Sequence, residues 1–131
     1  MAITLYHYTR ASNIEKIIQN GLLPSLLSRG DAQWGDGQYF TDLTPEEVAT
    51  KTRFQVSYAL FRMPWMWGGQ PPLPEIGCLR CILTESNVKS VAPLFGKQFP
   101  HRSIFLYPNE KILDIKTLDY ETDYPLHFAS E

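Results

Sequence analysis

Two short stretches near the N-terminus, residues 5–9 (LYHYT) and residues 35–43 (GDGQYFTDL), decide the fold predicted for this chain. The first places a histidine and a threonine on a predicted opening strand. The second leads a tyrosine out of a glycine-flanked turn into another strand. A histidine and a tyrosine offered from adjacent strands can bind a ribose and stack on a flat heterocycle. His7 and Tyr39 are therefore the leading candidates for a binding site.

The composition is typical of one globular domain spanning residues 1–131. A chain of this length, 44% hydrophobic and 20% charged, is large enough to bury a single core. Its net charge of −2 argues against a groove that neutralises many phosphates, so a nucleic acid is not the favoured partner. No run of about 18 apolar residues and no secretory signal is visible, which predicts no membrane span. The expectation is a cytoplasmic protein, or a domain of a larger chain whose targeting information lies elsewhere.

Hydrophobic patterning predicts an α+β domain whose early strands alternate with helices and whose second half is dominated by strands. The predicted strands cover residues 3–8, 38–41, 78–83, 103–107 and 111–115, with an irregular connection over residues 88–99.

Two helices are predicted between the early strands. Capping boxes at residues 12–15 (SNIE) and 44–47 (TPEE) predict where they begin. Gly21 ends the first helix, and the second extends to about Phe61. The proline-rich residues 63–74 are predicted to form a loop, which is either a lid or partner-contact loop or a loop folded over the core.

Cys78 and Cys81 are the only cysteines, and their C-x-x-C spacing invites a metal or redox interpretation. They lie on a predicted strand, however, where residues three apart point to opposite faces. The sequence holds no second Cys/His pair that would complete a tetrahedral site. We therefore predict two buried or half-buried structural thiols and no bound metal.

The two N-terminal stretches resemble a known family. His7-Tyr8-Thr9 followed by residues 35–41 is similar to the first two motifs of the ADP-ribosyltransferases of the diphtheria-toxin and poly(ADP-ribose) polymerase lineage. The similarity is closest to small toxin-type domains with the HYD signature, and it is strong over roughly residues 4–45. It implies an ADP-ribosyltransferase-like split β-sheet that binds NAD as co-substrate and needs no metal.

The resemblance also implies roles for individual residues. His7 would contact the adenosine ribose of NAD, Tyr39 would stack on nicotinamide, and Thr9 would lie beside the nicotinamide ribose or amide. Many relatives carry glycine directly after the histidine, whereas this chain has Tyr8, which bears on the width of the pocket. The complete set of predicted NAD-binding residues is His7, Tyr8, Thr9, Gly37, Tyr39, Phe40 and Thr41.

A third catalytic residue implied by the resemblance is an acid on a late strand that hydrogen-bonds the nicotinamide ribose. Such a carboxylate stabilises the oxocarbenium-like transition state more than the ground state. Glu110 opens a predicted strand, as the acid does in polymerase-like members, and Asp114 matches the aspartate of the closer relatives. Glu110 is favoured and Asp114 is retained. The acidic residues of the segment 119–123 are predicted to form a solvated face.

The resemblance therefore implies a mono-ADP-ribosyltransferase that transfers ADP-ribose from NAD to a macromolecular acceptor, as a toxin or effector delivered into a target cell. A protein acceptor is favoured over a nucleic acid, and an inhibitor protein is a further candidate partner. One alternative is an NAD glycohydrolase that uses the same residues. Another is a non-enzymatic module that binds NAD or ADP-ribose, which is favoured if neither Glu110 nor Asp114 reaches the nucleotide cleft.

Overall fold

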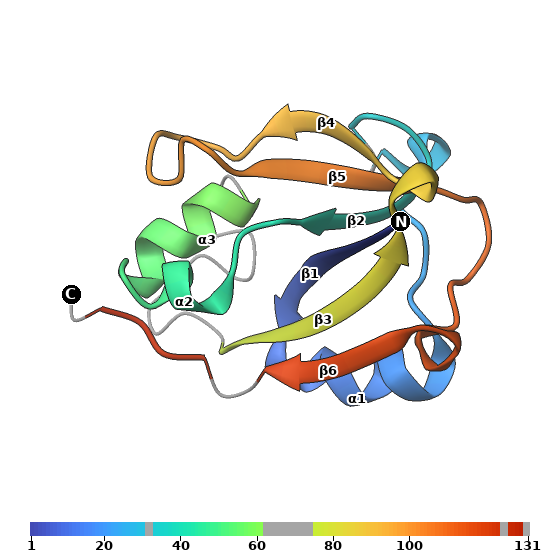
Figure 1. The fold of residues 1–131 in the computed structure, drawn as a ribbon, viewed down its shortest axis with the longest axis horizontal. Helices are drawn as coiled ribbons and strands as arrows, with labels where there is room; N and C mark the ends of the chain where they lie inside the picture. The colour runs from blue at the N-terminus through green and yellow to red at the C-terminus, as the bar shows by residue number, and fades with distance from the viewer. Residues whose placement is uncertain (31–32, 62–74, 124–125, 130–131) are drawn as a thin grey trace.

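The computed structural model describes residues 1–30, 33–61, 75–123 and 126–129. Six strands form one sheet in the order β4-β5-β2-β1-β3-β6, with helices packed against it (Figure 1). This confirms the α+β class predicted from the sequence. The strands are β1 (Ala2–Arg10), β2 (Gly37–Thr41), β3 (Ile76–Thr84), β4 (Lys89–Pro93), β5 (Ser103–Pro108) and β6 (Asp119–Asp123).

The sheet consists of two three-stranded halves. β1 pairs antiparallel with β3 along its whole length, from Ala2 opposite Thr84 to Arg10 opposite Ile76, and β6 continues this half. β2, β5 and β4 form the other half through antiparallel ladders. β1 and β2 are joined by one residue pair, Tyr6 with Thr41. Figure 1 shows β1 and β2 separating from each other toward α2 and α3.

Within the described residues, three α-helices accompany the sheet: α1 (Ala11–Asn20), α2 (Pro45–Val48) and α3 (Arg53–Phe61). The capping box predicted at the start of α2 is confirmed. The Thr44 hydroxyl accepts from the Glu47 N–H at 3.2 Å, and the Glu47 carboxylate accepts from the Thr44 N–H at 3.1 Å. The box predicted at Ser12 is wrong, because α1 already begins at Ala11 and its N-cap, Arg10, makes no side-chain capping bond.

The predicted long second helix is in fact two helices. The Thr52 hydroxyl accepts from the Gln55 N–H at 3.1 Å, and the Gln55 side chain accepts from the Thr52 N–H at 3.0 Å. This second reciprocal capping box begins α3, and its T-x-x-Q spacing was present in the sequence. The predicted lid or partner-contact loop of residues 63–74 lies outside the described residues.

The strand predicted over residues 111–115 is wrong. The chain bends there, and Leu113 alone forms an isolated bridge, to Leu22. Asn109 and Asp114 are the physical reason, because their side chains accept from the N–H groups of Lys111 and Lys116, which favours turns over a ladder.

The last strand, β6, is formed instead by the segment predicted as a solvated acidic face. It pairs with β3 along residues 119–123, and Asp119 and Glu121 on it are exposed. β4 likewise lies inside the connection predicted to be irregular.

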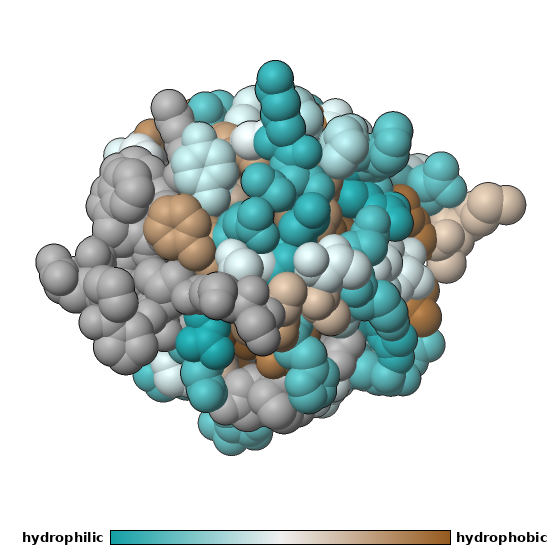
Figure 2. All heavy atoms as spheres, turned by 90° about the vertical axis from the view of Figure 1, so that its left-hand side faces the viewer, coloured by the Kyte–Doolittle hydropathy of each residue, from teal (hydrophilic) through white to brown (hydrophobic). Residues whose placement is uncertain are grey.

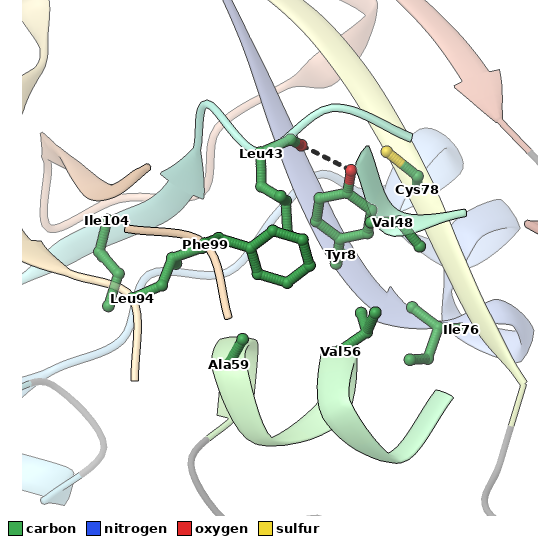
Figure 3. Packing of buried hydrophobic residues seen from close by; sticks show 10 residues of the cluster. All are labelled: Tyr8, Leu43, Val48, Val56, Ala59, Ile76, Cys78, Leu94, Phe99 and Ile104. Carbon is green, nitrogen blue, oxygen red and sulfur yellow. Dashed lines mark hydrogen bonds between the residues drawn. The ribbon is translucent and has the colours of Figure 1, made fainter. Parts of the chain in front are cut away.

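Two hydrophobic clusters lie on opposite faces of β1 and β3. One packs Tyr8 against Val56 and Ala59 of α3, as Figure 3 shows. The other contains Leu5 and Ile14, on the α1 side. Cys78 belongs to the first cluster and Cys81 to the second, and both are fully buried. The prediction of two buried thiols on opposite faces is therefore confirmed.

The side that carries α2 and α3 has a mixed surface. Hydrophilic residues cover much of its described part, and hydrophobic residues show in small separate areas (Figure 2). Among the described helices, none is both long enough and apolar enough to span a bilayer.

Candidate active site

A cleft of about 330 Å³ lies where β1 and β2 separate. It is within the size range of small-molecule sites. Half of its lining residues are aromatic, so the walls suit a flat ring better than a ligand that carries several charges. The lining comprises Tyr6, His7, Tyr8, Ser25, Gln33, Trp34, Tyr39, Phe40, Thr41, Leu60, Phe61, Leu94, Phe95 and Ile104.

The His7 side chain is half-buried and held in one orientation. Its Nδ1 lies 2.8 Å from the Tyr39 carbonyl oxygen, and because a carbonyl only accepts, Nδ1 carries the proton. The ring meets Phe40 edge to face, with centroids 5.9 Å apart. Burial lowers the pKa of His7, partly offset by the hydrogen bond to Tyr39. The neutral imidazole therefore keeps an unprotonated Nε2, which can accept a hydrogen bond from a hydroxyl group.

The Tyr39 hydroxyl is already hydrogen-bonded to the segment before its own strand. It donates to the Gly35 carbonyl at 2.7 Å and accepts from the Trp34 N–H at 3.0 Å. The Tyr39 ring therefore has a fixed position, and its aromatic face is the part available to a ligand. Trp34 packs beside it with ring centroids 6.1 Å apart.

Three further residues of the predicted NAD-binding set line the cleft but also hold the fold together. The Tyr8 hydroxyl donates to the Leu43 carbonyl at 2.6 Å, drawn as a dashed line in Figure 3, so its ring contributes wall rather than a polar contact. Phe40 is 3% exposed and packs in the second core cluster. The Thr41 hydroxyl donates to the Ser103 carbonyl at 2.7 Å.

Two residues of that set do not line the cleft. The Thr9 hydroxyl accepts from the Asn13 side chain at 3.5 Å, on the first turn of α1. Gly37 is buried against β5, where an added Cβ would come within 2.1 Å of the Tyr107 carbonyl oxygen. These contacts give both residues a structural role.

Both candidate acids are exposed, and neither lines the cleft. The Asp114 side chain caps the short 3₁₀ helix of residues 115–117 by accepting from the Lys116 N–H at 3.0 Å. Glu110 lies in the bend that follows β5. That bend is tied to β2, because the Gln38 side chain donates to the Lys111 carbonyl at 2.8 Å and accepts from Asn109 at 3.2 Å.

Formal charges are absent from the described lining of the cleft. Asp42 directly follows β2, and its carboxylate accepts from the Ser103 N–H at 2.8 Å and lies 3.7 Å from Arg102. Arg102 also pairs with Glu47 at 2.8 Å. Over the described part of the chain, no three His, Cys, Asp or Glu side chains gather as a metal site would require.

Sequence reasoning did not assign Tyr6, Trp34 and Phe95 to the site, yet all three line it. Tyr6 lies within the first of the two stretches singled out, and Trp34 directly precedes the second. Phe95 follows β4, in a segment predicted to be irregular, and it is brought to the cleft by the pairing of β4 with β5 and by its N–H, which donates to the Ala59 carbonyl of α3 at 3.0 Å.

Comparison with known proteins gives one match. The model of a family described as HYD1 signature containing ADP-ribosyltransferase matches residues 5–70, half of the chain. No curated protein and no solved structure matches significantly. The matched span contains His7, Trp34 and Tyr39 and ends before Glu110 and Asp114.

Proposed function

This chain belongs to the HYD1 signature containing ADP-ribosyltransferases, a family of toxin domains that implies NAD as a substrate, and we propose that it transfers ADP-ribose from NAD to a protein. The observation that carries this proposal is the cleft itself. It brings His7, with its orientation fixed, and the face of Tyr39 to one aromatic-lined space.

The proposed reaction breaks the bond between the ribose carbon and the nicotinamide nitrogen. The bonding electrons leave with nicotinamide, which neutralises its positive charge and leaves an oxocarbenium-like ribose. A nucleophilic side chain of the acceptor forms the new bond to that carbon and loses its proton to solvent. The work of the site is to hold both ends of NAD while this charge develops.

His7 fits the role of a ribose anchor. Its Nδ1–H donates to the Tyr39 carbonyl, so its Nε2 can accept from a ribose hydroxyl without any change of tautomer. The same bond couples the His7 ring to the strand that carries Tyr39. We propose that the Tyr39 ring stacks on nicotinamide, since its hydroxyl is already engaged by backbone groups.

Glu110 is the better candidate for the acid. In the described residues its side chain makes no hydrogen bond or ion pair, whereas the Asp114 carboxylate caps a helix. Glu110 is also held near the start of β2 by the Gln38 and Asn109 contacts. A carboxylate that reaches the ribose from this bend would stabilise the developing charge.

Nicotinamide release from NAD by the purified protein tests the proposal. We expect wild-type turnover, a loss of about 100-fold or more in Glu110→Gln, and retained turnover in Asp114→Asn with reduced stability only. Transfer is tested by incubation with a cell lysate and labelled NAD, where label on protein bands supports a protein acceptor. Nicotinamide release without any labelled macromolecule would support a glycohydrolase instead.

A second candidate is a module that binds NAD or ADP-ribose without cleaving it. The observation in its favour is that neither Glu110 nor Asp114 lines the cleft, because binding needs no acid for the transition state. It predicts calorimetric NAD binding by the wild type together with no nicotinamide release, even with lysate present. Turnover that depends on Glu110 would exclude it.

A further inference from the structure

Trp34 and its neighbours form a continuous aromatic wall in the cleft. The Trp34 ring lies 6.1 Å from the Tyr39 ring and 6.4 Å from the Phe95 ring, centroid to centroid. Both spacings are those of rings in direct contact. A ligand ring therefore cannot be inserted between them and must pack on the surface that they share.

We propose that Trp34 is a substrate-binding residue that contacts the nicotinamide ring beside Tyr39, and that the Tyr39 hydroxyl positions it. This rests on the proposed function. The Trp34 ring packs against the ring of Tyr39, which is proposed to stack on nicotinamide. The His7 ring, which is proposed to contact the adenosine ribose, packs against Phe40 instead. Trp34 therefore belongs to the nicotinamide end of the site.

The orientation of the two rings defines what each does. The Trp34 and Tyr39 planes are inclined by 52°, so one flat ring cannot stack on both faces. A nicotinamide stacked on Tyr39 meets the Trp34 ring at its edge, which is a favourable geometry between aromatic rings. Trp34 thus limits how far the leaving group can slide along Tyr39, and a larger base would be obstructed.

The positioning is done by the backbone of residues 34–35. The Trp34 N–H donates to the Tyr39 hydroxyl, and that hydroxyl donates to the Gly35 carbonyl. One phenol oxygen therefore holds the peptide group that precedes Trp34 and the peptide group that follows Gly35. Removing it leaves the Tyr39 ring in place but releases the segment that carries Trp34.

Steady-state kinetics with three ligand probes test this. In Trp34→Ala we expect the KM for NAD and the inhibition constant of nicotinamide to rise about tenfold. The dissociation constant of ADP-ribose, which lacks nicotinamide, should stay within about twofold. Trp34→Phe should retain most of the affinity. Phe54→Ala, which removes an exposed aromatic ring of α3 outside the cleft, is the matched control and should match wild type.

The positioning role has its own test. Tyr39→Phe should weaken nicotinamide binding, and the same change made in Trp34→Ala should have no further effect, since the hydroxyl would act through Trp34. Additive losses would overturn the positioning role. Unchanged nicotinamide affinity in Trp34→Ala, or an equal loss for ADP-ribose, would overturn the assignment of Trp34 while NAD cleavage by the wild type stands. Absence of NAD binding in the wild type would overturn the proposed function and this inference together.

Discussion

At the scale of single residues, the neutral state of His7 determines how the protein should respond to acid. Burial lowers its pKa below the ordinary value of 6.5, so the imidazole stays neutral at pH 7 with Nε2 free to accept. We expect kcat/KM for NAD to be level from pH 8 to about 6.5 and to fall at lower pH, as Nε2 becomes protonated. A fall centred above pH 6.5 would contradict this role of His7.

The lowered pKa of His7 also makes the free energy of unfolding depend on pH. Because the unfolded chain binds a proton at His7 near pH 6.5 and the folded chain does so only at lower pH, the free energy of unfolding should decrease as pH falls through that window. Urea titrations at several pH values measure it. In His7→Gln, which cannot titrate, this part of the pH dependence should disappear. Gln also carries an acceptor oxygen, so partial NAD affinity should remain.

Residue types and spacing were enough to find His7 and Tyr39 as candidates, because the local pattern around each is distinctive. They were not enough for Thr9 and Gly37, which lie in the same stretches yet face α1 and β5. The direction of a side chain depends on strand pairing, and a pattern within one strand does not contain its partner. For that reason Phe95 was also missed.

At the scale of elements, the β2–β5 ladder depends on a glycine. Gly37 has φ +151° and lies opposite Pro108, so a methyl group there would collide with the Tyr107 carbonyl oxygen and with Leu106. We expect Gly37→Ala to reduce the free energy of unfolding by about 3 kcal/mol, because the two strands must move apart.

Gly30→Ala is the matched control for that substitution. Gly30 has φ +78°, and an added Cβ meets nothing within 4 Å, so backbone strain is its whole penalty. We expect a loss of about 1 kcal/mol there. Urea unfolding of both variants compares them directly. Equal losses would show that strain, rather than the close approach of β5, sets the requirement at Gly37.

The elements that the sequence predicted well are those with strong local signals. The Thr44 capping box and the strands around His7 and Tyr39 are confirmed. The C-terminal segment was mispredicted because its apolar residues, such as Leu113 and Ile115, fill the core from a bend and a 3₁₀ turn instead of a strand. Alternation of polar and apolar residues cannot distinguish a strand from a bend followed by a 3₁₀ turn, and here the side chains of Asn109 and Asp114 stabilise such local turns.

At the scale of the whole molecule, the two cysteines report on whether the domain unfolds as one unit. Cys78 and Cys81 lie on the same strand but in different core clusters, and burial raises the pKa of Cys81 to about 12. We expect iodoacetamide to modify neither thiol in the folded protein at pH 8. Because β3 pairs with β1 along nine consecutive residues, both thiols should become reactive at the same urea concentration.

Single-cysteine variants, Cys78→Ala and Cys81→Ala, make that measurement specific to each cluster. Each leaves one thiol whose alkylation midpoint can be compared with the loss of circular dichroism. Two separated midpoints would contradict cooperative unfolding of the two clusters. They would instead indicate that one side of the sheet opens while the other stays packed.

The strand order also has a consequence for how this domain is synthesised. β1 carries His7 but its full-length partner is β3, which begins at residue 76, and β2 carries Tyr39 but pairs with β5, which begins at residue 103. On a ribosome, the residues proposed to bind NAD therefore emerge long before the strands that hold them in place. Nascent chains released before β5 should be unable to form the cleft. We therefore expect NAD binding only from chains in which β5 has already been synthesised.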